Sequence, residues 1–420
     1  MNPGDFQSVL ARVARRHALG WLVAANTIGC LLAAVLVWPG LGGGSAVLSY
    51  GRLMPVHLNG QLYGWCALPL VAALLASCLE PRHPAAAIHA RVVLFAWSAA
   101  LALGAAAWLG GVTSGKLFLD WAGWARPLLG AAMAALWAVL AAHLWWGRDR
   151  ARTLRWRASA GLLAGLTAVP SLLYWSAGRE VYPAVNPHSG GATGASLLGS
   201  TLGIVAVFGL LPVLLGVARR PGRGVAWFWW ALAASFAAFG LIDHGHASHH
   251  ASGQIVGLGL LLVWIPLLWA YGAAWSWSPG ARRWALAAGA WWAVLVASGW
   301  ATFLPGLSEA WKFTHVLVAH AHLAMAGLVT AVNFAVLHEL DPARPVGGRR
   351  LFWTWQLATL AHVALMFFLG AREDAAAAEL FYGADWTRWI FAGRLLAGLV
   401  MLGAAAAAWA GEFRRERTLS

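Results

Sequence analysis

Histidine is the residue whose spacing in this sequence most clearly indicates chemistry. Nine of the 15 histidines fall in four short segments. They are His57 in MPVHLNGQLYGW, His188 in NPHSGGATG, His244, His246, His249 and His250 in LIDHGHASHHASG, and His315, His320 and His322 in FTHVLVAHAHLAM. Neutral imidazole is the commonest transition-metal ligand in proteins, and histidine inside a membrane is costly and usually functional. These segments therefore predict metal or haem binding.

Two of these histidines form an HxH pair inside an apolar run. In an α-helix His320 and His322 would point about 200° apart, because each residue adds about 100°. Side chains on opposite sides of one helix cannot easily share a metal ion. Each can instead bind a different centre, one on either flank of the helix.

The segment HGHASHH has a different geometry. If it is helical, His246 and His250 share a face at spacing i,i+4, and the adjacent His249 can contribute a third ligand. Such a cluster suits a single copper, iron or zinc ion, whereas the alternative interpretation is a solvated polar loop. The three cysteines form no CxxC or CxxCH signature, so we expect neither a disulfide framework nor covalently attached haem.

The elements that position these residues are predicted by composition. The chain has 420 residues, of which 60% are hydrophobic and 10% charged, against about 25% charged in an ordinary soluble domain. Apolar runs of about 20 residues, the length needed to cross a bilayer, recur throughout. We expect twelve transmembrane helices in a single domain over residues 1–420, near 18–41, 57–79, 86–109, 124–147, 155–177, 193–217, 224–242, 251–276, 283–304, 313–338, 350–370 and 387–411.

The distribution of arginine predicts the orientation of these helices. The net charge is +14, but the basic residues are spread over short connections, which suits membrane orientation better than nucleic-acid binding. Most of them fall on one side of a twelve-span topology, before the first span, in alternate connections and in the tail. Cytoplasmic loops contain the Lys/Arg excess, so we expect both termini to be cytoplasmic and the N-terminus to have no removable signal peptide. The nine histidines then converge on the outer half of the bundle.

The pattern resembles subunit I of the haem–copper oxidases over nearly the whole chain. The most specific elements are a histidine at the start of the second span, a histidine cluster after the seventh and VAHAH in the tenth. The segments VHLNGQLYGW, SGKLFLDW and FAGRLLAGLV are more similar to C-type cytochrome c oxidases and nitric oxide reductases than to mitochondrial-type enzymes.

The resemblance implies an all-α, twelve-helix haem protein with two b haems. His57 and His322 would be the axial ligands of a low-spin haem, and His320 would be the proximal ligand of a high-spin haem. Two residues of the cluster His244, His246, His249 and His250, preferably His249 and His250, would bind copper or non-haem iron. Arg394 and Arg388 in the last span would pair with haem propionates.

The sequence also departs from the family pattern. Gly199-Ser200 replaces the Gly-His pair expected early in the sixth span, so a third metal ligand is missing or is supplied elsewhere, for instance by His188. The seventh span, GVAWFWWALAASFAAFGLI, lacks the tyrosine of C-type oxidases. Asp243 is the only acid beside the histidine cluster. No catalytic residue is assigned.

The resemblance implies a respiratory oxidoreductase in a bacterial inner (plasma) membrane. Electrons would enter from cytochrome c or a quinol and reduce oxygen or nitric oxide, with an additional subunit as partner and lipid around the bundle. The alternative is a non-catalytic electron-transfer or gas-sensing haem protein with a degenerate metal site. A third possibility is a metal or haem transporter, which predicts no stable cofactor.

Overall fold

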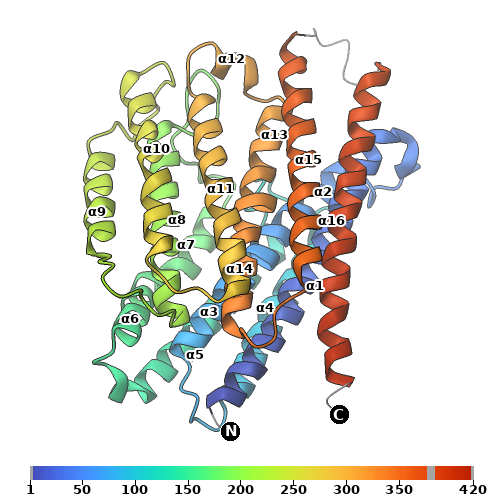
Figure 1. The fold of residues 1–420 in the computed structure, drawn as a ribbon. Coiled ribbons are helices and arrows are strands. Elements are labelled where there is room, and N and C mark those ends of the chain that lie inside the picture. The colour runs from blue at the N-terminus through green and yellow to red at the C-terminus, as the bar shows by residue number, and fades with distance from the viewer. Residues whose placement is uncertain (1–2, 376–383, 418–420) are drawn as a thin grey trace.

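The computed structural model describes residues 3–375 and 384–417, and this part of the chain is helical. The only β-type pairings in it are two isolated bridges, Val185 with Ala192 and Arg219 with Trp275. An apolar chain satisfies its backbone N–H and C=O groups within lipid by forming helices. The predicted all-α fold is therefore confirmed (Figure 1).

Eleven helical segments are long and apolar enough to cross a membrane. They are α1 (Pro3–Val37), α2 (Tyr50–Asn59) continued through η2 (Gly60–Cys66) into α3 (Leu68–Cys78), α4 (Ala86–Leu109), η3 (Gly123–Ala125) with α5 (Arg126–Trp146), α6 (Leu154–Leu166) with α7 (Val169–Ser176), α8 (Gly194–Leu215), α10 (Ser252–Ala273), α11 (Pro279–Ala301), α13 (His315–His322) continued through η5 (Leu323–Val329) into α14 (Thr330–Leu340), α15 (Arg349–Ala375), and α16 (Asp385–Arg417). The shorter elements are η1 (Pro39–Gly42), η4 (Arg148–Arg150), α9 (Ala226–Gly240) and α12 (Leu307–Trp311).

Two predicted spans differ from the observed helices. The seventh, predicted over 224–242, is the 15-residue helix α9, about 22 Å long at 1.5 Å per residue and shorter than the roughly 30 Å hydrocarbon core. The first helix begins at Pro3, well before the predicted start at 18. Its basic N-terminal turns stay helical because they are packed: the buried Arg15 donates to the carbonyl oxygens of Leu337 and Asp341.

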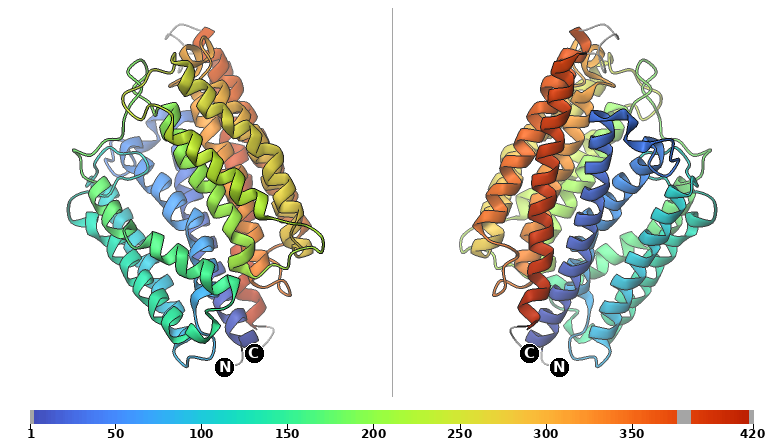
Figure 2. Two further views of the ribbon diagram at one scale, coloured as in Figure 1. Left: turned by 90° about the vertical axis from the view of Figure 1, so that its left-hand side faces the viewer. Right: turned by 90° about the vertical axis from the view of Figure 1, so that its right-hand side faces the viewer.

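The helices that contain the predicted haem ligands pack against one another around one interior region of the bundle. α1 packs against both α2 and α16, α16 packs against α15, and α15 packs against α13. The right-hand view of Figure 2 shows α1 and α16 running side by side, and both views place the two termini at one end of the bundle. A small apolar cluster joins α1, α13, α15 and α16 next to this region. Its members are Ala33, Val37, Ala319, Met366, Leu369, Phe391 and Leu395.

Two π-helical segments follow the predicted low-spin ligands closely. The segment η2 begins at Gly60, three residues after His57, and η5 begins at Leu323, directly after His322. The two π segments pack against each other, and Trp65 joins the halves by donating from its indole N–H to Thr330 Oγ1 at 2.8 Å. Its carbonyl accepts from Asn333 Nδ2 at 2.8 Å. Single π turns inside α-helices occur frequently at functional sites.

Candidate functional site: histidines at the centre and at both ends of the bundle

The imidazoles of His57 and His322 are held in the same protonation form by backbone carbonyl groups. The Nδ1 atom of His57 lies 2.8 Å from the Ala25 oxygen on α1, and the Nδ1 atom of His322 lies 2.8 Å from the Val318 oxygen on its own helix. A carbonyl oxygen can only accept, so each Nδ1 carries the hydrogen. Each Nε2 therefore keeps its lone pair, which is the form that coordinates a metal ion through Nε2.

The helix α1 leaves room for the His57 ring at a glycine. A Cβ atom at Gly29 would lie 2.6 Å from His57 Cε1, closer than any ordinary contact. A side chain at this position would therefore displace the ring. Gly29 thus has a steric role that the sequence analysis did not identify.

Arg394 and His362 complete the polar lining of this region. Arg394, on α16, lies within electrostatic range of His57, His322 and His362. Its Nε is buried without a hydrogen-bond partner, and no carboxylate among the described residues forms an ion pair with its guanidinium group. A partly buried guanidinium without an acidic partner is costly within a membrane, so the arrangement favours a bound anion. Arg388, by contrast, is exposed.

The side chain of His320 contacts a different helix from the side chain of His322. Its Nδ1 lies 3.1 Å from Ser298 Oγ on α11, and a Cβ at Gly299 would lie 2.9 Å from its Cε1. The ring of His322 instead lies 4.6 Å from that of His362 on α15. The two histidines therefore face opposite flanks of α13, as their helical spacing predicts. The serine hydroxyl can accept from His320 Nδ1, which leaves its Nε2 available as well.

The HGHASHH segment is a loop, so the predicted i,i+4 pairing of His246 with His250 does not form. His246 Nδ1 accepts from the Val185 N–H at 3.2 Å, and His244 packs on the Phe239 ring at 4.5 Å. Neither residue points into a shared site. The helix α9 ends at Gly240, and side-chain hydrogen bonds of Asp243, Ser248 and Gln254 hold the loop that follows.

The adjacent pair His249 and His250 does form a cluster, and Glu309 of α12 completes it. Glu309 Oε1 lies 2.8 Å from His249 Nε2 and 3.2 Å from His250 Nε2, and one ligand atom from each residue fits within 4.8 Å. His188 adjoins the cluster, with its ring 5.1 Å from that of His250. We call His188, His249, His250 and Glu309 the outer cluster.

The electrostatics of the outer cluster suit a cation. The hydrogen bond with His249 is the main reason that the pKa of Glu309 is lowered to about 2, so its carboxylate is ionised at physiological pH. The Nδ1 of His249 lies 3.4 Å from Asn186 Oδ1, a contact that orients the ring with Nε2 toward Glu309. The interpretation of Asp243 as the only acid beside the histidines is wrong. Glu309 is distant in sequence from these histidines. The one sequence feature that points to it is its position in a connection on the same predicted outer side of the membrane.

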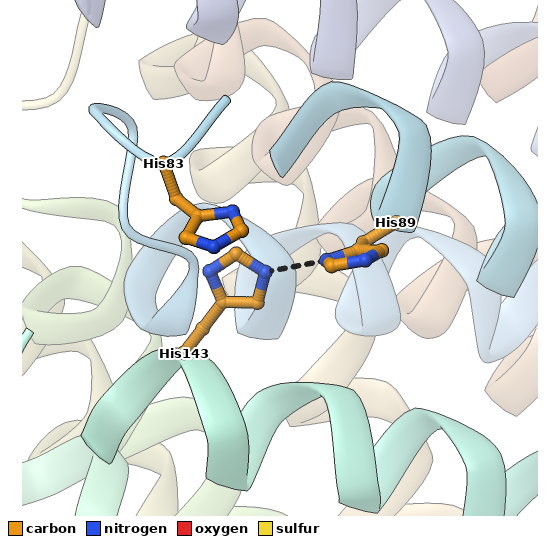
Figure 3. A group of neighbouring side chains, drawn as sticks. All are labelled: His83, His89 and His143. Carbon is orange, nitrogen blue, oxygen red and sulfur yellow. Dashed lines mark hydrogen bonds between the residues drawn. The ribbon is translucent and has the colours of Figure 1, made fainter. Parts of the chain in front are cut away.

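A third group of histidines lies at the opposite end of the bundle. His83, His89 and His143, which we call the inner cluster, each offer a ligand atom within 4.8 Å of the others (Figure 3). His143 Nε2 lies 2.9 Å from His89 Nδ1, and the ring of His83 stacks on Trp146 at 4.3 Å and 3°. The His83 ring is therefore partly buried against Trp146.

The hydrogen bonds of the inner cluster differ from those of His57 and His322, whose Nδ1 atoms donate to backbone carbonyls. The Nδ1 of His143 accepts from the Glu80 N–H at 3.1 Å, so its Nε2 carries the hydrogen and donates to His89 (Figure 3). The Nδ1 of His83 likewise accepts from the Ala85 N–H at 3.3 Å. A neutral imidazole that binds a metal through Nε2 carries its hydrogen on Nδ1. In His143 and His83 that hydrogen would point at a backbone N–H, which is itself a donor. The inner cluster is therefore a hydrogen-bonded His89–His143 pair with the His83 ring packed against it in the observed conformation.

Neither a protein-family model nor a curated protein matches this sequence.

Proposed function

We propose that the protein is a membrane haem-dependent respiratory oxidoreductase of the haem–copper oxidase subunit I type. The observation that supports this most directly is the shared protonation form of His57 and His322. Both rings donate from Nδ1 to a backbone carbonyl, both leave Nε2 free, and both lie beside π-helical turns that pack together. They would be the axial ligands of a low-spin b haem.

The remaining lining of the region fits a haem better than a simple ion. Haem has carboxylate side chains, and Arg394 is a partly buried guanidinium whose Nε has no hydrogen-bond partner and which forms no ion pair with a described carboxylate. Gly29 makes room at the His57 ring. Apolar residues of α1, α13, α15 and α16 close the neighbouring region, which suits a large, mainly apolar macrocycle.

The residues of the chain then have separate roles in electron transfer. A haem with two imidazole ligands supplies a one-electron redox couple whose potential depends on its surroundings. His57 and His322 would orient that group, and Arg394 would neutralise one of its carboxylates. His320, on the other flank of α13, would hold a second, high-spin haem, so one short helix would link the two centres.

The outer cluster is the proposed site of the second metal, copper or non-haem iron. His249 and His250 would each supply Nε2, Glu309 would supply Oε1, and His188 is placed to supply the ligand that Gly199-Ser200 does not. Ser200 is exposed and donates to the Leu197 carbonyl of its own helix. Oxygen or nitric oxide would be the electron acceptor, and cytochrome c or a quinol would be the donor, together with an additional subunit.

One observation favours the non-catalytic alternative. The side chains of His250 and Glu309 are 50% and 47% exposed, and both lie in connections at the end of the bundle. A binuclear site that reduces oxygen needs a dry, enclosed metal ion facing the haem iron. With such exposure, and without a tyrosine in α9, the chain would serve as an electron-transfer or gas-sensing haem protein.

The fold is consistent with the proposed topology. The two termini lie at one end of the bundle (Figure 1), which supports an even number of crossings. The shorter α9 would supply the twelfth crossing beside the eleven long helices. The proposal places both termini in the cytoplasm of a bacterium, with the bundle in the inner membrane.

The deciding experiment is a pair of difference spectra of the purified protein, reduced minus oxidised and with carbon monoxide, together with haem and metal analysis. Two haems per chain, one binding carbon monoxide, with about one copper or extra iron would support the enzyme. One low-spin haem that does not bind carbon monoxide would favour the non-catalytic alternative. A protein purified without haem would refute both.

The ligand assignment is tested by His57→Ala. We expect this variant to lose the low-spin haem, seen as loss of the bis-imidazole spectrum and lower haem content per protein. His246→Ala is the control, because His246 is also a histidine but only accepts a backbone hydrogen bond in the outer loop. A bis-imidazole spectrum that survives His57→Ala would exclude His57 as an axial ligand.

A further inference from the structure

His362 lies in the middle of α15, where its ring is buried beside that of His322. It is only 6% exposed, and its ring lies 4.6 Å from that of His322 at an interplanar angle of 38°. Neither ring nitrogen forms a hydrogen bond that meets distance and angle limits, although the Arg394 backbone lies close to the ring. Among the described residues it is the only histidine whose buried ring nitrogens both lack a partner.

The other buried histidines of comparable depth are satisfied. His143 bonds with the Glu80 N–H and with His89, and His249 bonds with Asn186 and Glu309. A buried polar group without a partner costs about 1–3 kcal/mol. Packing alone would be served better by an apolar side chain, so the imidazole without a well-formed hydrogen bond indicates a ligand beside His322.

We propose that His362 is an alternative axial ligand on the same side as His322. This inference rests on the proposed low-spin haem site. When His322 leaves the iron, one Fe–N bond breaks and another forms to a ring nitrogen of His362. Both imidazoles are neutral before and after, so the exchange moves no electron and no net proton.

Three features of the structure favour this exchange. The two rings lie on neighbouring, directly packed helices, so a side-chain rotation spans most of the separation. His362 breaks no hydrogen bond of ordinary geometry when it moves. Its ring has only the nearby Arg394 backbone as a polar neighbour on the main chain, whereas Nδ1 of His322 is held by the Val318 carbonyl at 2.8 Å.

The test compares His322→Ala with the double variant His322→Ala/His362→Phe, in which phenylalanine keeps a ring but removes the nitrogens. We expect His322→Ala to retain a six-coordinate, low-spin spectrum that does not bind carbon monoxide. The double variant should become five-coordinate, bind carbon monoxide and lose haem several-fold. Optical spectra, electron paramagnetic resonance of the oxidised haem and the haem-to-protein ratio give the readout.

The control is His322→Ala/His143→Ala, which removes a buried histidine far from the site and should behave as His322→Ala does. If His322→Ala does not accumulate, His322→Gln replaces it, because glutamine keeps the volume and is a poor ligand for haem iron. A single variant that already binds carbon monoxide as fully as the double variant would overturn the role of His362 while leaving His57 and His322 as ligands. Wild-type protein without haem would instead refute the underlying function, and the inference with it.

Discussion

At the scale of single residues, the hydrogen-bond partner of Nδ1 separates histidines with different chemistry. The same side chain donates to a carbonyl at His57 and His322, and accepts from a backbone N–H at His143 and His83. The first arrangement frees Nε2 for a metal and the second protonates it. Proximity of imidazoles alone does not show this difference, because the inner cluster is as close-packed as the outer one.

A prediction at this scale concerns Gly29. The substitution Gly29→Ala would place a Cβ 2.6 Å from His57 Cε1, so the ring must move from its position. We expect a clear loss of haem content and of low-spin absorption, with the helical circular dichroism unchanged. Gly20→Ala on the same helix is the control, because its Cβ meets the Trp409 ring at an ordinary 3.5 Å. Equal haem content in the two variants would contradict the steric role.

At the scale of elements, connections between helices decide which histidines meet. The short helix α12 brings Glu309 to the loop after α9, and the loop before α8 adds His188. The four members come from three different connections. By contrast, α13 acts as a rigid spacer that directs His320 to α11 and His322 to α15.

The corresponding prediction is that metal binding depends on the outer cluster and not on the inner one. Glu309→Gln keeps the size of the side chain but removes its charge, and we expect the affinity for Cu²⁺ or Zn²⁺ to fall about 10–100-fold. His89→Ala should leave that affinity unchanged, because backbone N–H groups donate to Nδ1 of His143 and His83 and so keep the hydrogen of each ring on Nε2. Titration calorimetry with each metal ion measures both. A larger effect at His89 than at Glu309 would reverse the two assignments.

At the scale of the whole molecule, the main question is whether α9 crosses the membrane. Its 15 residues span less than the usual hydrocarbon thickness, yet both termini lie at one end of the bundle (Figure 2). A crossing is possible if neighbouring helices shield the ends of α9 or if the bilayer thins locally. The count of eleven long spans alone would place the termini on opposite sides.

Topology labelling tests this directly. Single cysteines at Gly222 and Ser248, on either side of α9, are placed in a background in which Cys30, Cys66 and Cys78 are replaced by serine. We expect a membrane-impermeant thiol reagent applied to intact cells to label the Ser248 position and not the Gly222 position. Labelling of both positions from one side would show that α9 does not cross.

The sequence alone predicted that lipid surrounds most of the chain, that the chain is helical and which histidines could bind a metal or haem. An apolar, weakly charged chain in lipid must form helices, and helical periodicity within one segment correctly placed His320 and His322 on opposite flanks. Properties that depend on a single helix follow from sequence because the local backbone geometry is nearly invariant. The predicted start of α1 and the length of α9 were wrong, because tertiary packing of Arg15 and the polar loop after Gly240 set those ends.

Only the tertiary structure decided which side chains meet. Glu309, Gly29, His362 and the inner cluster are each brought to their partners by contacts between helices or loops distant in sequence. The tautomers of His57 and His143 also depend on such contacts, since Ala25 orients His57 from another helix and Glu80 orients His143. These short-range contacts decide the chemistry because a hydrogen bond or a steric clash changes sharply over a fraction of an ångström, a precision that spacing along the chain does not provide.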